Sequence, residues 1–296
     1  MDAIETDRLT KFYGEHRGIE DLTMAVEPGE VFGFLGPNGA GKTTTIRTLL
    51  DLLHPTRGNA RLFGLDSRLD SVAIRRRLGN LPGDFGYGKA ATGRDAVSLL
   101  ARLRGVHELG RAEALARRFR ADLDRPLGEL SRGNRQKVGL ILAVFHSPDL
   151  LILDEPTSGL DPLMQEEFLA LVREERERGC AVFLSSHELD EVERVCDRVG
   201  IIRDGTLIAV ERVPDLLAKT PRRASVEFTE PIDLAELRGC AGVSELEVAG
   251  DKVTFKVLGP PDQVVKALAH HTVSDLEFAR PTLEEVFLTY YQDDAP

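Results

Sequence analysis

The sequence predicts an α/β fold followed by a smaller α+β unit, and three observations support this prediction. An apolar run at residues 31–35 continues directly into a glycine-rich segment at residues 36–44, and a helical pattern of apolar residues follows it. A second apolar run, residues 150–153, ends at an acidic pair. After about Ala218 the composition changes, and short apolar runs alternate with short helical patterns. Strands that alternate with helices are typical of a parallel sheet covered by helices.

The first elements predict a small antiparallel subdomain and then a phosphate-binding arrangement. Leu22, Met24 and Val26 alternate with polar residues, as expected for a half-buried antiparallel strand. The apolar run at residues 31–35, the glycines and a helix predicted for residues 43–53 follow one another. This is the order of elements that a phosphate-binding loop requires.

The stretch between about residues 78 and 147 is predicted to be a helical insertion in the core. Apolar residues recur there at helical spacing, and no strand-like run interrupts them. The sheet resumes after the insertion and ends in a hairpin with a turn at Asp204-Gly205. The helices of the insertion are expected at residues 94–104, 109–119 and 135–145, and the next strands at residues 150–153, 181–185, 199–202 and 206–210.

The C-terminal unit is predicted to contain a strand, a helix, two strands, a helix, a strand and a final helix. This order indicates a small ferredoxin-like α+β sandwich. We therefore expect a core domain of residues 1–217 and an accessory domain of residues 218–296. The accessory elements are expected at residues 225–228, 234–237, 244–248, 252–257, 261–269, 273–278 and 282–291.

Composition and charge limit the classes of function. The 296 residues are 42% hydrophobic and 29% charged, which is typical of a globular protein with about two domains. The formal net charge of −11 argues against nucleic-acid binding, because neutralising phosphates requires clustered Lys and Arg. No apolar run reaches the ~18 residues of a membrane span, and the polar N-terminus is unlike a signal peptide. The 3 cysteines lack metal-ligand spacing, so we expect a chain in the reducing cytosol.

Residues 36–44, with the sequence GPNGAGKTT, match the phosphate-binding loop pattern in full. The glycines let successive backbone N–H groups converge on phosphate oxygens, and the positive end of the following helix adds to the attraction. Lys42 is expected to reach the β- and γ-phosphates of ATP, and the Thr43 hydroxyl is expected to bind Mg²⁺. The alternative is a glycine-rich turn with a fortuitous lysine. The flanking strand and helix argue against that alternative.

Two other positions suit a nucleotide site. Asp154 ends a predicted buried strand, where a P-loop ATPase holds its Mg²⁺, and Glu155 follows it. The alternative is that both acids only cap the next loop. Ser131 is predicted to cap a helix whose N–H groups and dipole can bind a phosphate. The alternative there is an ordinary helix cap.

The ordered set of motifs resembles the ATPase subunit of ABC transporters, and the resemblance covers about residues 4–215. It implies that Glu155 polarises the attacking water and that His187 contacts the γ-phosphate and the catalytic carboxylate. It also implies that Tyr13 stacks on adenine. A structural histidine and an ordinary exposed aromatic are the alternatives. The motifs are GPNGAGKTT at residues 36–44, LSRGN at 130–134, LLILDEP at 150–156, SGLD at 158–161 and SSHELDEVE at 185–193.

The resemblance implies a composite site, in which Ser131 faces the nucleotide of a second subunit. One chain carries one phosphate loop and one LSRGN motif, so two chains must meet head to tail to complete two sites. The metal ligands implied are Thr43 and Asp154. The nucleotide-binding residues implied are Tyr13, Gly36, Pro37, Asn38, Gly39, Ala40, Gly41, Lys42, Thr43, Thr44, Ser131, Gly133 and Asp161.

The sequence departs from the family pattern in two places. Arg132 replaces the first glycine of the LSGGQ motif, and Asn134 replaces its glutamine. Arg132 either adds a cation near the phosphate or projects away from it. The loop whose glutamine normally senses Mg²⁺ corresponds to residues 81–85, where Gly83 stands in place of the glutamine. Metal sensing by the adjacent Asp84 is not expected.

The resemblance implies an ATPase that dimerises on ATP and drives a separate membrane permease from the cytoplasmic face of the membrane. The segments GNRQK, DEPTSGLDP and RPTLEEVF resemble those of bacterial drug and antibiotic exporters. One alternative is the ATPase of an importer. Another is a soluble ABC ATPase that acts on ribosomes or DNA without a transporter, against which the acidic charge and the single cassette argue.

Overall fold

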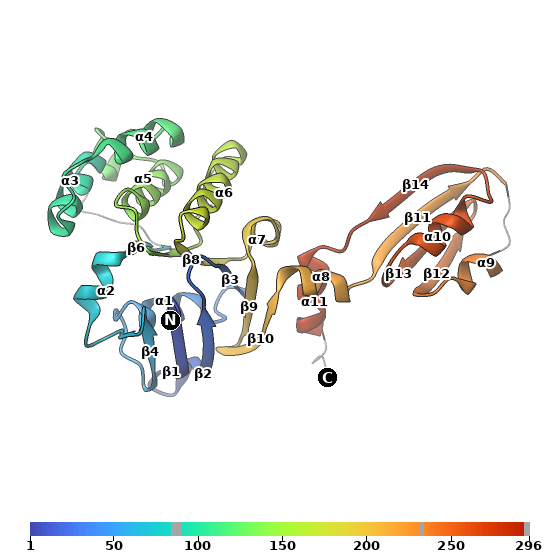
Figure 1. Cartoon of the computed structure of the whole chain (residues 1–296), viewed down its shortest axis with the longest axis horizontal. Helices are drawn as coiled ribbons and strands as arrows, with labels where there is room; N and C mark the ends of the chain where they lie inside the picture. Colours follow the sequence, from blue (N-terminus) through green and yellow to red (C-terminus); the bar gives the residue numbers. More distant parts are fainter. Residues whose placement is uncertain (84–89, 231–233, 293–296) are drawn as a thin grey trace. The chain divides into compact units, whose positions relative to one another are not determined.

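The computed structural model describes residues 1–83, 90–230 and 234–292 and divides the chain into two compact units. The first unit, Met1–Glu211, contains two sheets, and the second, Arg212–Pro296, contains a third (Figure 1). The boundary predicted from the sequence, residue 217, lies inside helix α8 (Val213–Lys219).

The central sheet of the first unit has six strands in the order β10-β9-β3-β8-β7-β6. Its strands from β9 to β6 run parallel to their neighbours. Since parallel strands end at the same edge of a sheet, the residues that follow β3, β7 and β8 are brought together. The strands are β3 (Val31–Leu35), β6 (Leu78–Leu81), β7 (Leu150–Asp154), β8 (Ala181–Ser186), β9 (Arg198–Arg203) and β10 (Thr206–Arg212).

The predicted antiparallel subdomain is a four-stranded sheet in the order β2-β1-β4-β5. Helix α1 (Lys42–Leu49) lies between it and the central sheet, and ends before the predicted residue 53. Ile4 and Ile46 share one hydrophobic core with Phe34 and Phe183, so both sheets and α1 pack around the same interior. The strands are β1 (Ile4–Tyr13), β2 (His16–Val26), β4 (Arg57–Leu62) and β5 (Leu65–Asp66).

The helical insertion is present, but its predicted start at residue 78 is wrong. Residues 78–81 form β6, which pairs with β7 at the edge of the central sheet. This strand includes Gly79 and Asn80 and therefore lacks a continuous apolar run. Gly79 is required because a Cβ there would collide with the carbonyl oxygen of Ala143. The helices around it are α2 (Ser71–Arg77), α3 (Gly93–Arg104), α4 (Gly110–Phe119), a 3₁₀ turn η1 (Leu127–Glu129) and α5 (Arg132–Val144).

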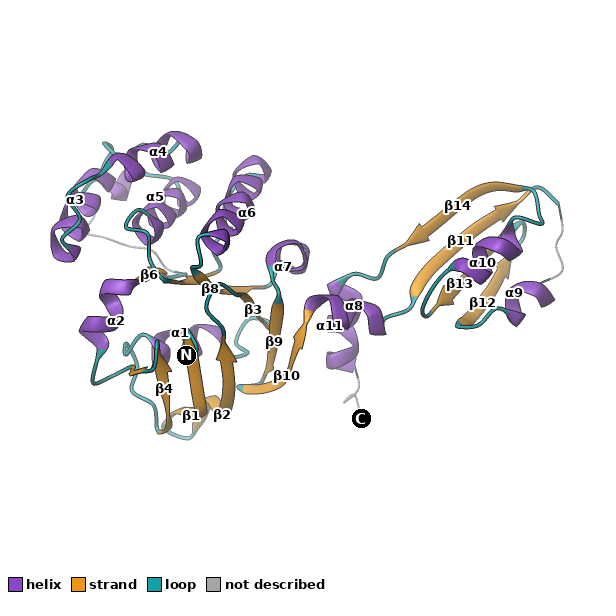
Figure 2. Cartoon of the chain, in the orientation of Figure 1, coloured by secondary structure: helices purple, strands orange, loops and turns teal. Residues whose placement is uncertain are grey.

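Helices α6 (Pro162–Glu177) and α7 (Leu189–Val195) complete the first unit. The second unit has an antiparallel sheet in the order β12-β13-β11-β14, with α9 and α10 on one face (Figure 2). Helix α11 packs against α8. The elements after α8 are β11 (Arg222–Phe228), α9 (Ala235–Gly239), β12 (Val243–Ala249), β13 (Lys252–Val257), α10 (Asp262–Leu268), β14 (Val273–Ala279) and α11 (Leu283–Gln292).

Candidate nucleotide site

The loop between β3 and α1 has a shape that only glycine allows at two positions. A Cβ at Gly36 would lie 2.5 Å from the carbonyl oxygen of Ile202. Gly41 has a φ of +112°, and a Cβ there would lie 2.8 Å from the carbonyl oxygen of Gly18. Gly41 also caps α1 without a side-chain hydrogen bond. The N–H groups of the first helical turn therefore stay available to an anion, which the helix dipole attracts.

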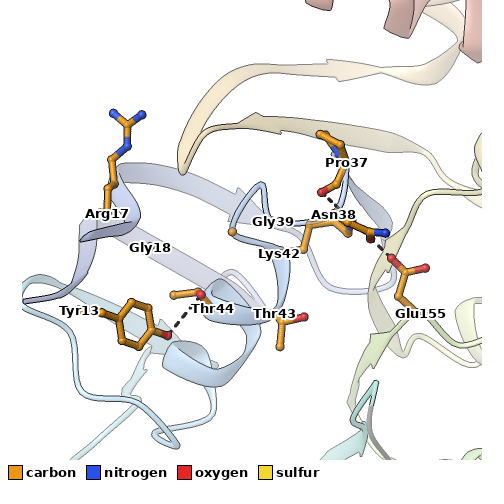
Figure 3. Close-up of a pocket in the computed structure, with 11 residues that line it drawn as sticks. Tyr13, Arg17, Gly18, Pro37, Asn38, Gly39, Lys42, Thr43, Thr44 and Glu155 are labelled. Atoms are coloured by element: carbon orange, nitrogen blue, oxygen red, sulfur yellow. Dashed lines mark hydrogen bonds and ion pairs between the residues drawn. The ribbon is translucent and has the colours of Figure 1, made fainter. Parts of the chain in front are cut away.

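A pocket of about 300 Å³ lies over this loop. Tyr13 stands at one end and Glu155 at the other, with Lys42 and Thr43 between them (Figure 3). Tyr13 is 45% exposed, and its hydroxyl lies 3.4 Å from Thr44 Oγ1. The residues that line the pocket are Tyr13, Arg17, Gly18, Pro37, Asn38, Gly39, Gly41, Lys42, Thr43, Thr44 and Glu155.

Arg17 and Gly18 also line the pocket, although neither belongs to a motif that indicates a nucleotide site. They lie in β2, at the start of the alternating strand, and only the fold places them beside the phosphate loop. A Cβ at Gly18 would lie 2.8 Å from the Tyr13 ring, so the absence of a side chain there gives the tyrosine its position. A glycine inside a strand often marks a close approach of other groups, and this is the signal that Gly18 offers in the sequence.

Lys42 is buried at the centre of the site, with 6% of its side chain exposed. Its Nζ donates hydrogen bonds to the carbonyl oxygens of Gly36, at 2.5 Å, and Pro37, at 3.3 Å. It also lies 3.4 Å from Glu155 Oε1. The ammonium group of Lys42 therefore lies within the phosphate loop, held by two carbonyl oxygens of the loop and by the Glu155 carboxylate.

Oxygen ligands for a hard cation gather beside the loop. The Thr43 hydroxyl donates to Asp154 Oδ2 at 2.9 Å, and the Ser185 hydroxyl donates to Asp154 Oδ1 at 2.6 Å. A hydroxyl and a carboxylate are donors that Mg²⁺ prefers, so these residues fit the ion. A Cβ at Gly83 would lie 3.1 Å from Asp154 Oδ2, so Gly83 borders this group without adding a ligand from a side chain. Asp84 lies outside the described residues.

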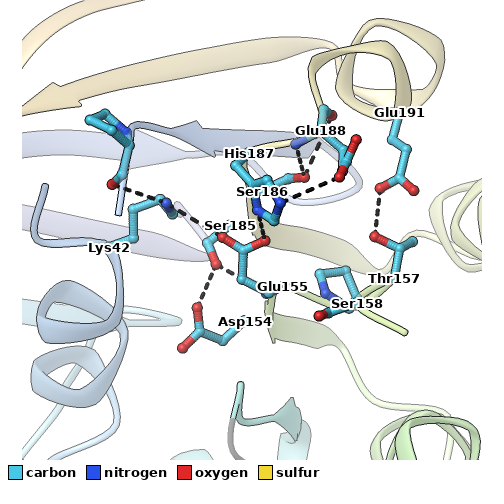
Figure 4. A network of polar contacts seen from close by, with 12 residues as sticks. Lys42, Asp154, Glu155, Thr157, Ser158, Ser185, Ser186, His187, Glu188 and Glu191 are labelled. Atoms are coloured by element: carbon cyan, nitrogen blue, oxygen red, sulfur yellow. Dashed lines mark hydrogen bonds and ion pairs between the residues drawn. The ribbon is translucent and has the colours of Figure 1, made fainter. Parts of the chain in front are cut away.

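Glu155 is joined to His187 directly. Its Oε2 lies 2.5 Å from His187 Nδ1 (Figure 4). The backbone at Glu155 is left-handed, with a φ of +50°, and its N–H donates to the carbonyl oxygen of Ser185. Buried Gln136 donates from Nε2 to the carbonyl oxygens of Glu155 and Pro156, at 3.0 and 2.9 Å. Contacts from β8 and α5 thus support the conformation that points the carboxylate toward His187.

The LSRGN residues lie at the start of α5 and contact the loop after Glu155. The Ser131 side chain caps α5 by accepting from the N–H of Asn134 at 3.3 Å. Arg132 donates from Nη2 to Ser158 Oγ at 2.7 Å, so its side chain lies along this loop. Gly133 packs so closely on Gly159 that a Cβ would collide with the Gly159 carbonyl oxygen.

The structure does not bring every predicted nucleotide-binding residue to one place. Asp161 caps α6 by accepting from the N–H of Met164 at 3.1 Å. The described lining of the pocket does not include Asp161, Ser131 or Gly133. Ala40, a residue of the loop itself, is buried. Within one chain, the predicted nucleotide-binding residues are therefore divided between the pocket and the starts of α5 and α6.

The fold and the phosphate cradle define the class of protein: a P-loop nucleotide-binding ATPase. The family model described as ABC transporter matches residues 19–158. The bacitracin transport ATP-binding protein BcrA of Bacillus licheniformis is 38% identical over 228 residues, which cover 76% of this chain and 74% of that protein. The chain belongs to the ABC transporter family, as an ATP-binding, ATP-hydrolysing subunit.

Other similarities extend over both units or concern the fold. The daunorubicin/doxorubicin resistance ATP-binding protein DrrA of Streptomyces peucetius is 33% identical over 307 residues, covering 97% of this chain and 91% of that protein. A solved ATP-binding subunit of an ABC transporter aligns with a TM-score of 0.69 and 32% identity, covering 72% of this chain and 91% of that one. In the part of the chain that the structure describes, no helix combines the length and apolarity needed to cross a membrane.

Proposed function

We propose that two copies of this chain bind ATP at their interface and power a separate membrane permease that exports a drug-like or antibiotic compound. The observation that carries the proposal is the cluster of Lys42, Glu155 and His187 at the carboxyl edge of the sheet, beside the Thr43–Asp154 pair. The names of BcrA and DrrA, which concern antibiotic transport and resistance, support export over import.

In this proposal, the contacts described above indicate the role of each residue in ATP hydrolysis. Lys42 exchanges the carbonyl oxygens of Gly36 and Pro37 for the β- and γ-phosphates and offsets their charge. Glu155 accepts a proton from the attacking water. His187, 2.5 Å from the far oxygen of that carboxylate, keeps it oriented.

Two residues are proposed to hold the metal. Thr43 and Asp154 would hold Mg²⁺, which neutralises charge on the phosphate oxygens when it is bound. Ser185 fixes Asp154 from the other side, so the carboxylate is oriented before a metal arrives. Tyr13, at the open end of the pocket, offers its ring face to the adenine base.

The surface at the start of α5 supports a composite site. Ser131 and Arg132 are exposed there and do not belong to the described lining of the pocket of their own chain. A second chain that presents its bound ATP to this surface would complete two equivalent sites, because a head-to-tail pair uses each pocket once. The permease would hold the pair at the cytoplasmic face of the membrane.

The test is the Glu155→Gln variant, expressed with its membrane partners. We expect it to bind ATP, to form a dimer that size-exclusion chromatography resolves, and to show no steady-state hydrolysis. Purification from membranes should also recover a protein with several membrane spans together with this chain. Turnover at the wild-type rate would remove Glu155 as the base, and recovery of the chain without any membrane protein would overturn the transport proposal.

A further inference from the structure

Two parallel links join the loop after β7 to the segment that begins α7. The first is the contact of 2.5 Å between Glu155 and His187. The second lies further from the pocket, where the Thr157 hydroxyl donates to Glu191 Oε2 at 2.8 Å (Figure 4). The loop and the start of α7 are thus tied at two points, of which only the first involves groups proposed to take part in hydrolysis.

The second link is partly buried, and one oxygen of its carboxyl group is fully enclosed. Thr157 is only 4% exposed. Glu191 Oε1 is buried and has no hydrogen-bond partner among the residues that the structure describes. Burial raises the pKa of Glu191, the Thr157 hydroxyl opposes this, and the nearby Glu188 and Glu155 carboxylates raise it further. A buried polar atom without a partner is unfavourable, so an apolar residue would serve stability better at this position.

The other polar contacts at the start of α7 include one within its own segment, where His187 Nε2 lies 3.3 Å from Glu188 Oε1. Glu188 caps the helix without a side-chain hydrogen bond, and its N–H donates to Ser186 Oγ at 2.9 Å. His187 itself is half exposed. Val192 and Val195 of α7 are buried, and Val195 lies one turn after Glu191 on the same face of the helix.

We propose that Glu191 is a positioning residue for ATP hydrolysis, which acts through Thr157 to keep Glu155 and His187 in register. This inference rests on the proposed function of Glu155. Neither Glu191 nor Thr157 belongs to the described lining of the nucleotide pocket. Loss of the link should therefore lower kcat while the KM for ATP stays nearly constant, because the carboxylate samples wrong orientations but the phosphate cradle is intact.

The experiment compares four substitutions in the full chain. Thr157→Val removes the hydroxyl with little change in shape, and Glu191→Leu removes the acceptor. Each should lower kcat about tenfold, which corresponds to about 1.4 kcal/mol, with KM within about twofold of wild type. Thr157→Ser and Glu191→Gln keep a donor and an acceptor, and both should restore most of the rate. The double variant Thr157→Val/Glu191→Leu should be no slower than the slower single variant, because the two residues form one link.

A matched control tests whether any loosening of α7 has the same effect. Arg194, also in α7, forms an exposed ion pair with Glu166 in α6 at 2.6 Å. Glu166→Gln weakens this attachment without touching the loop after β7. We expect it to leave kcat within about twofold of wild type, as an exposed ion pair contributes little.

A readout without catalysis follows the imidazole of His187. In chain labelled with ¹⁵N-histidine, its ring resonances are assigned by their loss in His187→Ala. Thr157→Val should shift them in the absence of nucleotide, while Glu166→Gln should leave them in place. Unchanged kcat and unchanged His187 resonances in folded Thr157→Val would overturn the inference, as would rate losses that add up in the double variant. Equal losses of kcat, ATP affinity and thermal stability would assign the pair a purely structural role and overturn it too.

The proposed function is tested separately in the same assay. If Glu155→Gln still hydrolyses ATP, the assignment of the base fails, whatever the Thr157 and Glu191 variants show. If Glu155→Gln is inactive but Thr157→Val and Glu191→Leu turn over normally, the proposed function stands and only the positioning inference fails.

Discussion

The Thr43 hydroxyl donates a hydrogen bond of 2.9 Å to Asp154 Oδ2, joining the start of α1 to the end of β7. The two oxygens face the same space, so a cation there would replace the hydrogen bond between them. We predict that Thr43→Val lowers the affinity for ATP about tenfold when Mg²⁺ is present and leaves the affinity in EDTA nearly unchanged. Valine keeps the shape of threonine and removes the hydroxyl that would bind the metal. Titration of a fluorescent ATP analogue with and without Mg²⁺ measures both. An equal loss in the two conditions would show that Thr43 acts on the phosphates rather than on the metal.

Ser131→Arg is expected to prevent the ATP-driven dimerisation of two chains while leaving ATP binding by a single chain intact. Ser131 lies outside the described pocket lining of its own chain, so the affinity of a single chain for ATP should stay within about twofold of wild type. A long cation at the first turn of α5 would block the approach of a partner. ATP should therefore no longer shift the Glu155→Gln background to a dimer in analytical ultracentrifugation. Normal dimerisation of the variant would show that this surface does not meet the partner's nucleotide.

The boundary between the two units gives a prediction about truncation. Val213 and Leu216 of α8 are buried, and α8 packs against α11. A chain that ends at Glu211 should fold and bind ATP, because every proposed pocket residue precedes it. A chain that ends at Lys219 keeps α8 without α11 and exposes those apolar side chains, so it should be less soluble. Limited proteolysis and ATP binding compare the two. Aggregation of the shorter chain alone would contradict this division.

His146 predicts a dependence of stability on pH. Burial lowers the pKa of His146 from 6.5 to about 4, and the charge of Arg104 acts in the same direction. Between these values the unfolded chain binds the proton and the folded chain does not. The contribution of neutral His146 to the free energy of unfolding is therefore complete above pH 6.5. It is lost as the pH falls toward 4, by about 3 kcal/mol over the full range.

The variant His146→Gln removes this titration and can place an amide donor near the Leu78 carbonyl oxygen, which lies 3.2 Å from His146 Nε2. Its free energy of unfolding should change less than that of wild type between pH 7 and pH 5, as measured by urea denaturation. Parallel pH profiles for the two chains would be inconsistent with a neutral histidine at this position.

The local motifs could be predicted because each is specified by neighbours in the sequence. The run at residues 31–35, the glycines and α1 follow one another in the chain, and β7 is an apolar run that ends in Asp154. Ser185 was not predicted, because its contact with Asp154 depends on the parallel register that places β8 beside β7. Gln136 was not predicted either, because its contact with the Glu155 carbonyl oxygen depends on the packing of α5 against the loop after β7.

Some elements were missed because their stabilising contacts come from the fold. Residues 78–81 become a strand only beside β7, and their glycine is needed for close packing with α5 rather than for a turn. The strands β1, β4 and β5 lack a clear alternation, and bulges interrupt the pairing of β1 with both of its neighbours. Pairing across the sheet defines these segments, and a periodic pattern in one strand does not reveal it.

The ion pair between Lys42 and Glu155 means that groups of the protein compete with the phosphates of ATP for the lysine. The lysine must leave the acid and two backbone carbonyl oxygens before it can reach a phosphate, so the measured affinity for ATP is a net value after these losses. Glutamine at position 155 removes the charge that holds Lys42 back. The inactive variant should then bind even a non-hydrolysable ATP analogue more tightly than wild type. A long-lived ATP complex in that variant would have two separate causes. Hydrolysis would be slower, and Lys42 would be held less firmly by groups of the protein itself.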